Sequence, residues 1–181
     1  MRKTLIAVGA GMVVVVVGIV VWAQQDKSKR PSPPASAKCQ FADGKGINVD
    51  YSSPRVKGRK IYGGLVPYGQ EWRTGANEAT TFDSTANVEI AGTTIPAGHY
   101  TLFTVPAEGT WKLVISKKTG EWGIPYPGKQ FDLARMDMKT QALPSNVENF
   151  SISFQKADPK SCVMNVDWEK TRAYVDIAEK K

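Results

Sequence analysis

The sequence predicts an all-β protein, an antiparallel β-sandwich of jelly-roll type, preceded by an apolar N-terminal transmembrane or signal helix. Apolar and polar residues alternate with a period of two over most of the chain after residue 39, which is typical of half-buried strands. Turn residues recur between these runs at short, fairly even intervals, as in sandwiches and barrels. A single closed barrel is the alternative architecture.

The alternation is clearest in short segments that each place apolar side chains on one face. With the turn signals between them, they predict roughly nine to eleven short strands and no long helix in the folded part. The clearest segments are 47–51, 111–115, 134–138, 150–154 and 173–177.

The N-terminal part of the chain predicts export. Residues 4–23 carry no charged side chain, and about 20 apolar residues suffice for a helix to cross a bilayer. Val21-Trp22-Ala23 also fits a small-x-small cleavage site before Gln24. A retained anchor and a cleaved signal peptide therefore both stay open. Either one places the folded part in the periplasm, tethered to the inner membrane or released.

Composition divides the chain into three parts: a signal or anchor (1–23), a flexible Pro/Ser-rich linker (24–38) and one folded domain (39–181). The first 38 residues hold six Lys/Arg and one Asp, whereas residues 39–181 hold 18 Lys/Arg and 16 Asp/Glu. The basic balance is thus largely a property of the leader. A nucleic-acid-binding domain would itself be basic along one face, so we expect no nucleic-acid partner.

Two cysteines frame the folded domain. Cys39 and Cys162 each share the apolar side of an alternating segment, and in an oxidising compartment such a pair forms a disulfide. Two buried free thiols are the alternative. His99 is the only histidine, and no CxxC motif accompanies it. We therefore expect neither a metal site nor a cofactor.

The most polar segment outside the predicted strands is Tyr68–Phe82, YGQEWRTGANEATTF. Its residues Arg73, Asn77 and Glu78 offer donors and acceptors beside a glycine, as a site for a polar ligand requires. They are equally suited to tying a long loop together through internal hydrogen bonds.

A second loop, GEWGIPYPG, carries Trp122 and Tyr126. Exposed flat aromatic side chains stack on sugar rings and other planar groups. The same residues also fit a rigid loop plugged by its own aromatic side chains. The candidate ligand-binding residues are therefore Arg73, Asn77, Glu78, Trp122 and Tyr126.

Candidate catalytic residues are few. His99 has no evident partners for triad chemistry, and the chain lacks a GxSxG motif. A glycoside hydrolase would need two carboxylates a few ångströms apart, for which Glu78 with Asp83 or Asp132 is the available choice. The sequence leans away from an enzyme.

Residues 53–177 resemble the bacterial family known as domain of unknown function 2911. The resemblance rests on SPRVKGRKIYGGLVPYGQEWRTGANEATTF, IPAGHYTLFTVP, EWGIPYPG with DLARMDM, and DWEKTRAYVDI. It implies an exported or membrane-attached all-β protein and implies no activity. The family's most recognisable residues match Trp72, Arg73, Gly75, Asn77 and Glu78.

The hypothesis from the sequence is an extracytoplasmic binding or structural module, tethered to the membrane through residues 4–23. Its partner would be a polar small molecule, a glycan or an envelope protein. A cell-envelope carbohydrate hydrolase is one alternative. An assembly module that pairs through an exposed sheet edge is the other.

Overall fold

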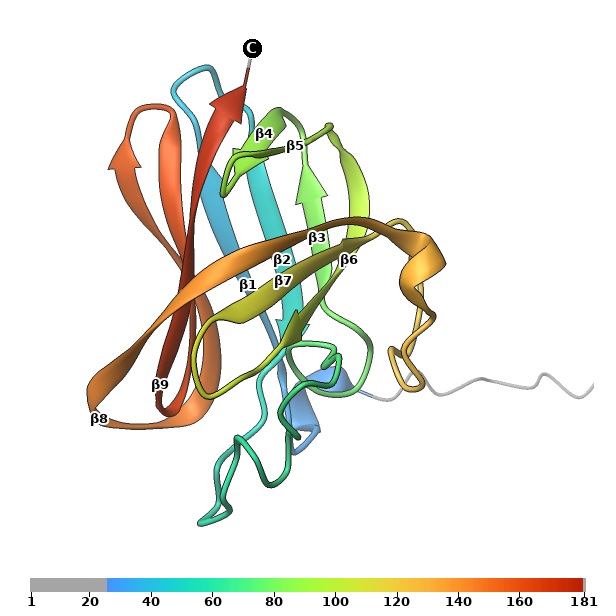
Figure 1. Cartoon of the computed structure of the whole chain (residues 1–181), viewed down its shortest axis with the longest axis vertical. Helices are drawn as coiled ribbons and strands as arrows, with labels where there is room; N and C mark the ends of the chain where they lie inside the picture. Colours follow the sequence, from blue (N-terminus) through green and yellow to red (C-terminus); the bar gives the residue numbers. More distant parts are fainter. Residues whose placement is uncertain (1–25, 181) are drawn as a thin grey trace, which may run out of the picture.

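A computed structural model describes residues 26–180 and contains one antiparallel sheet of nine strands, in the order β1-β2-β3-β6-β7-β8-β9-β4-β5 (Figure 1). Apart from two single-turn 3-10 helices, η1 (Lys27–Lys29) and η2 (Lys129–Phe131), the described chain is strands and loops. The strands are β1 (Pro34–Gln40), β2 (Gly46–Ser52), β3 (Thr81–Ser84), β4 (Asn87–Ile90), β5 (Thr93–Ile95), β6 (Gly98–Val105), β7 (Trp111–Ser116), β8 (Asp132–Asp158) and β9 (Ser161–Lys180). The all-β antiparallel prediction is confirmed.

The two longest strands differ from the short strands predicted. Segments 134–138 and 150–154 both belong to β8, which has 27 residues, because β8 stays paired with β9 across turn-like residues between them. The register of the β8–β9 pairing shifts between Ala142 and Val147 and again between Val147 and Ser151, and the two strands are paired on both sides of these irregularities. All nine strands are joined in one hydrogen-bonded sheet, so the predicted division of a sandwich into two sheets is not confirmed.

The sheet folds over so that its first strands lie against its last ones. The Tyr51 hydroxyl donates to the carbonyl of Ile152 at 3.3 Å, and the Ser53 hydroxyl donates to that of Phe150 at 2.6 Å. A disulfide between Cys39 in β1 and Cys162 in β9, with a Cα–Cα distance of 6.4 Å, ties the same two regions together. The predicted disulfide is confirmed.

An aromatic cluster fills the core between the folded halves. The Trp168 ring is 1% exposed and stacks on Trp72, with ring centroids 5.7 Å apart and planes inclined by 16°. Phe150 and Tyr62 meet the Trp168 ring edge-on at 5.6 and 6.4 Å. Such aromatic pairs stabilise a core beyond the area that they bury.

The folded domain begins earlier than Cys39. β1 starts at Pro34, Ala37 is buried in the core, and the carbonyl of Pro33 accepts a hydrogen bond from the Ser53 amide at 2.9 Å. Residues 34–38 are therefore part of the sheet rather than of a flexible linker, because alternating small side chains let this Pro/Ser-rich stretch pair with β2.

The predicted apolar helix at residues 4–23 lies outside the described residues. Within residues 26–180, no helix has the length and apolar character needed to span a membrane.

Candidate functional site

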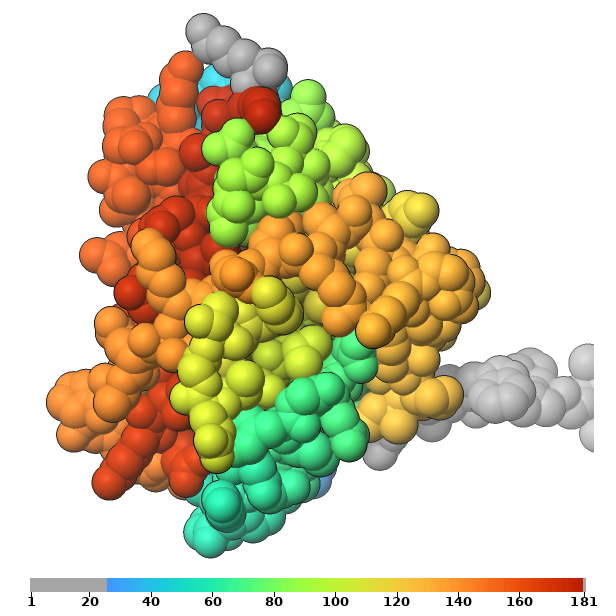
Figure 2. Space-filling view, in the orientation of Figure 1, coloured from blue at the N-terminus to red at the C-terminus, as the bar shows by residue number. Residues whose placement is uncertain are grey.

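A groove opens between the loop segments 53–80 and 117–131, which overlap the two segments that the sequence singled out, 68–82 and 120–128. We call it the loop groove; its volume is about 450 Å³. Figure 2 shows the segments around residues 60–75 (teal) and 120–130 (amber) at the lower and right-hand parts of one face. The lining residues are Leu65, Val66, Pro67, Gln70, Glu71, Trp72, Arg73, Gly123, Ile124, Pro125 and Tyr126.

Arg73 lies on one wall of the loop groove. Its Nη1 donates to the carbonyl of Trp122 at 3.2 Å, and its guanidinium lies over the Trp122 ring, 5.5 Å from the centroid. Within the described chain no carboxylate approaches the guanidinium within ion-pair distance. Burial lowers the pKa of Arg73, against the opposing charge of Glu78. Arg73 is thus a partly desolvated cation at the edge of a cavity.

Tyr126 contributes the polar end of the groove. Its ring meets Phe103 edge-on at 5.1 Å, and its hydroxyl donates to Asp132 and accepts from Arg135. Burial, followed by the Asp132 hydrogen bond, raises the pKa of Tyr126 to about 12. Arg135 also binds Glu71 at 2.8 Å. The Tyr126 ring, which lines the loop groove, is therefore held in place by Phe103, Asp132 and Arg135.

The rims of the loop groove are apolar and unusually exposed. Within residues 26–180, the four exposed large hydrophobic side chains are Leu65, Tyr68, Trp122 and Ile124, with exposures of 48, 40, 53 and 65%. All four lie in the two loops that form the groove. Clustered apolar exposure of this kind marks an interaction site more often than scattered single residues do.

Asn77 and Glu78 point away from the groove, toward residues 27–32. The Asn77 amide donates to the carbonyl of Ser32 at 2.9 Å, and Glu78 accepts from Arg30 Nη1 at 2.9 and 3.0 Å and pairs with Lys27 at 3.1 Å. The structure therefore brings together Arg73, Trp122 and Tyr126, and places Asn77 and Glu78 in a clamp on the N-terminal segment. Sequence reasoning missed Lys27, Arg30 and Ser32, because their contacts span more than 40 positions.

The clamp predicts a measurable pH dependence. A hydrogen bond from its own amide, burial acting in the opposite direction, and hydrogen bonds from Arg30 and Lys27 together bring the pKa of Glu78 to about 2. The depressed pKa stabilises the fold above the unfolded value of 4.5, and this stabilisation is lost as the pH falls toward 2.

We expect Glu78→Gln to lower the free energy of unfolding by about 1 kcal/mol at pH 7, since the pair is partly solvent-screened. The difference from the native chain should vanish near pH 2. Urea titrations at several pH values measure it. Glu108→Gln, at an exposed position that makes no ion pair in the described chain, is the matched control. An equal loss in both variants would contradict the clamp.

Trp72 and Gly75 support the loop from within. The Trp72 indole donates to the carbonyl of Gly75 at 3.0 Å, and the Trp72 backbone pairs with Thr104 of β6. Gly75 has φ +159°, and a Cβ there would lie 2.9 Å from the carbonyl oxygen of Ser52. Of the two charged residues in this block, Arg73 lines the loop groove, whereas Glu78 lines a smaller cavity of about 160 Å³ beside Lys27 and Arg30.

The carboxylates considered for hydrolysis are engaged separately. Asp83 pairs with His99 at 2.7 Å across β3 and β6, whereas Asp132 binds Tyr126 and Arg135. Glu78 is held ionised by the clamp. An acid and base pair for glycoside cleavage needs one raised pKa and one ionised carboxylate in a shared space, and these contacts do not provide it.

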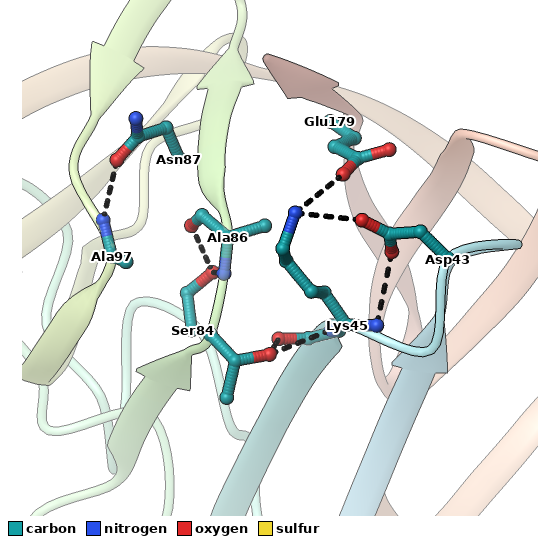
Figure 3. A network of polar contacts seen from close by, with 9 residues as sticks. Asp43, Lys45, Ser84, Ala86, Asn87, Ala97 and Glu179 are labelled. Carbon is teal, nitrogen blue, oxygen red and sulfur yellow. Dashed lines mark hydrogen bonds and ion pairs between the residues drawn. The ribbon is translucent and has the colours of Figure 1, made fainter. Parts of the chain in front are cut away.

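A second polar cluster, away from the loop groove, has a structural role (Figure 3). Lys45 Nζ lies 2.7 Å from Asp43 and 3.6 Å from Glu179, a β9 carboxylate whose side chain is 9% exposed. Asn87 accepts a hydrogen bond from the Ala97 amide at 3.0 Å. These contacts join the β1–β2 turn to the end of β9 and close the β4–β6 connection.

Comparisons with known proteins agree with the resemblance noted in the sequence. The family model described as protein of unknown function (DUF2911) matches residues 32–177. No curated protein and no solved structure matches the chain. The matched range begins at Ser32, whose carbonyl accepts a hydrogen bond from the Asn77 amide, and ends within β9. It therefore includes residues of all nine strands and the whole loop groove. The chain belongs to the DUF2911 family.

Proposed function

We propose that this protein is a periplasmic binding module, tethered to the inner membrane, that holds an amphipathic ligand with an anionic group in the loop groove. The folded-over sheet would act as a sandwich-like scaffold for the two loops. The Cys39–Cys162 disulfide supports an oxidising compartment, because disulfides persist outside the cytoplasm.

Arg73 is the observation that carries the proposal. Removing a guanidinium from water costs free energy that an ion pair with a carboxylate normally offsets. Arg135 and Arg172 have such partners in Glu71 and Asp167. Arg73 is half-buried, and within residues 26–180 its guanidinium has one hydrogen-bond acceptor, the Trp122 carbonyl. A carboxylate, sulfonate or phosphate on a ligand would take the remaining donors, since guanidinium binds such groups in a bidentate manner.

The rest of the groove supports an apolar body for the same ligand. Leu65, Pro67, Ile124 and Pro125 present apolar surface on both sides of Arg73. Ligand sites commonly combine such walls with a few placed polar groups. A volume near 450 Å³ fits a small amphiphile or the end of an acyl or aromatic chain.

The sheet edges give less support to an assembly role. The edge strand β1 begins with a proline and carries Lys38, and the other edge strand, β5, has three residues. Proline, lysine and short length are the features that protect an edge from pairing with another chain.

The test uses anilinonaphthalene sulfonate, a probe with an aromatic body and one sulfonate that fluoresces when shielded from water. With the chain from Gln24 onward, we expect saturable binding that Arg73→Met weakens about tenfold, which corresponds to losing one charge-assisted contact. Fluorescence titration measures both dissociation constants.

Lys156→Met, at an exposed position of β8, is the matched control for removing one positive charge. It should bind the probe as the native chain does. Equal affinity of the native chain and Arg73→Met would contradict a ligand site at Arg73. An equal loss in Arg73→Met and Lys156→Met would show attraction by net charge alone, and would contradict it too.

A further inference from the structure

A broader face surrounds the loop groove. We define the docking face as segments 26–33, 53–80 and 117–131. The clamp on Glu78 joins the first segment to the second. The second joins the third where the Ala79 amide donates to the carbonyl of Glu121 at 3.1 Å and Arg73 donates to Trp122. The three segments therefore form one continuous surface, part of which is visible in Figure 2.

The net positive charge of the described chain is concentrated on the docking face. The docking face holds 11 Lys/Arg and 4 Asp/Glu, a net charge of +7, whereas the other described residues hold 10 Lys/Arg and 13 Asp/Glu, a net charge of −3. Basic side chains surrounding exposed apolar ones form the pattern by which peripheral proteins bind anionic bilayers.

The exposed apolar residues of the docking face suit the lipid interface. Trp122 and Ile124 are 53 and 65% exposed on one loop, and Leu65 is 48% exposed across the groove. Tryptophan favours the boundary between headgroups and acyl chains, where an apolar ring and a polar edge are both satisfied. Leucine and isoleucine tips gain by leaving water for the same boundary.

The place where the N-terminal segment joins the domain favours a bilayer as the partner of the docking face. The described chain begins at Asp26, and Lys27 is already bound to Glu78 within the docking face. The apolar segment predicted to lie in the membrane ends at Ala23, and the docking face begins three positions later, at Asp26. Three residues span about 10 Å at most, which keeps the face beside the bilayer and makes its local concentration high.

We infer that the docking face rests on the surface of an anionic phospholipid bilayer, with Leu65, Trp122 and Ile124 at the boundary between headgroups and acyl chains. The clamp holds the N-terminal segment against the domain, so the domain is oriented by its own tether and does not tumble freely on it. This inference rests on the proposed membrane tether and goes beyond the proposed ligand site, because the face contacts lipid whether or not the groove is filled.

The experiment uses the full chain with its leader in nanodiscs containing 30% phosphatidylglycerol, without added ligand. Spin labels are placed through Leu65→Cys or Ile124→Cys with the native disulfide left intact. Ala157→Cys, exposed near the β8–β9 turn, is the matched control. Power-saturation measurements compare the accessibility of each label to oxygen, which concentrates in lipid, and to a water-soluble nickel chelate.

We expect oxygen to exceed the nickel chelate at positions 65 and 124, and the reverse at 157. Raising the salt from 0.1 to 1 M shortens the screening length from about 10 Å to about 3 Å and should return the loop labels toward the control value. Nanodiscs of phosphatidylcholine alone should do the same.

Three results would overturn the inference. Labels at 65 and 124 that stay as accessible to the nickel chelate as the one at 157 would show that the face does not touch lipid. Equal shielding of both labels in nanodiscs of phosphatidylcholine alone would contradict the requirement for anionic lipid. Shielding that appears only after an envelope protein fraction is added would assign the face to a protein partner. Because no ligand is present, none of these outcomes depends on the proposed groove function.

Discussion

Removing the Cys39–Cys162 cross-link should lower the free energy of unfolding by about 4–5 kcal/mol, from the loss of constraint on the unfolded chain. The two cysteines are 123 positions apart, so the disulfide closes most of the domain into one loop. In the chain-entropy model the effect grows with the logarithm of loop length. Since domains of this kind have only about 5–15 kcal/mol in total, about a quarter of the stability or more should be lost.

Urea unfolding of the oxidised chain and of the chain reduced in phosphine measures this difference. The reduced chain keeps both sulfur atoms in the core, where Cys39 and Cys162 are 4 and 2% exposed. The double variant Cys39→Ala/Cys162→Ala also removes the two sulfur atoms. The difference in free energy of unfolding between the reduced chain and this variant therefore measures the loss of packing alone. A reduced chain within about 1 kcal/mol of the oxidised one would contradict the assignment of stability to the cross-link.

Trp168→Ala should lower the free energy of unfolding by about 3–5 kcal/mol, the usual cost of emptying a large aromatic site in a core. The Trp168 ring contacts Trp72, Phe150 and Tyr62, and its indole donates to the carbonyl of Glu148 at 3.3 Å. Alanine would leave a cavity at the point where β9 meets the loop that carries Arg73. Urea titration followed by circular dichroism measures the loss.

Trp122→Ala is the matched control, because it deletes the same side chain from a position that is 53% exposed. We expect a change within about 0.5 kcal/mol for this surface substitution. Trp168→Phe should fall between the two and keeps the comparison usable if the alanine variant does not fold. Similar losses in Trp168→Ala and Trp122→Ala would mean that the aromatic cluster does not support the core as described.

The repeating strand pattern was readable from the sequence because burial in a sheet follows a period of two. Trp111, Leu113 and Ile115 are all buried in β7, and Met136 and Met138 are buried in β8, as alternation predicts. The continuity of β8 was not readable. Whether the chain stays extended between two strong segments depends on pairing with β9, and nothing local to residues 140–149 specifies it.

The candidate site was predicted in part. Arg73, Trp122 and Tyr126 were identified from their chemistry, and the structure brings them together around one groove. Asn77 and Glu78 looked equivalent to Arg73 in the sequence. Their side chains are used by Ser32 and Arg30 instead, and an ion pair between positions 48 apart depends on where the fold places each loop.

By itself, the sequence determined the all-β class and the family, because strand period and local motifs are properties of short segments. It left the two cysteines either as a disulfide or as buried free thiols, and the structure shows the disulfide. The tertiary structure alone decided that residues 34–38 belong to the sheet, that Glu78 holds the N-terminal segment, and that Arg73 is left beside a cavity. Those outcomes depend on which side chains and strands from distant parts of the chain lie next to each other, and only the folded structure brings them together.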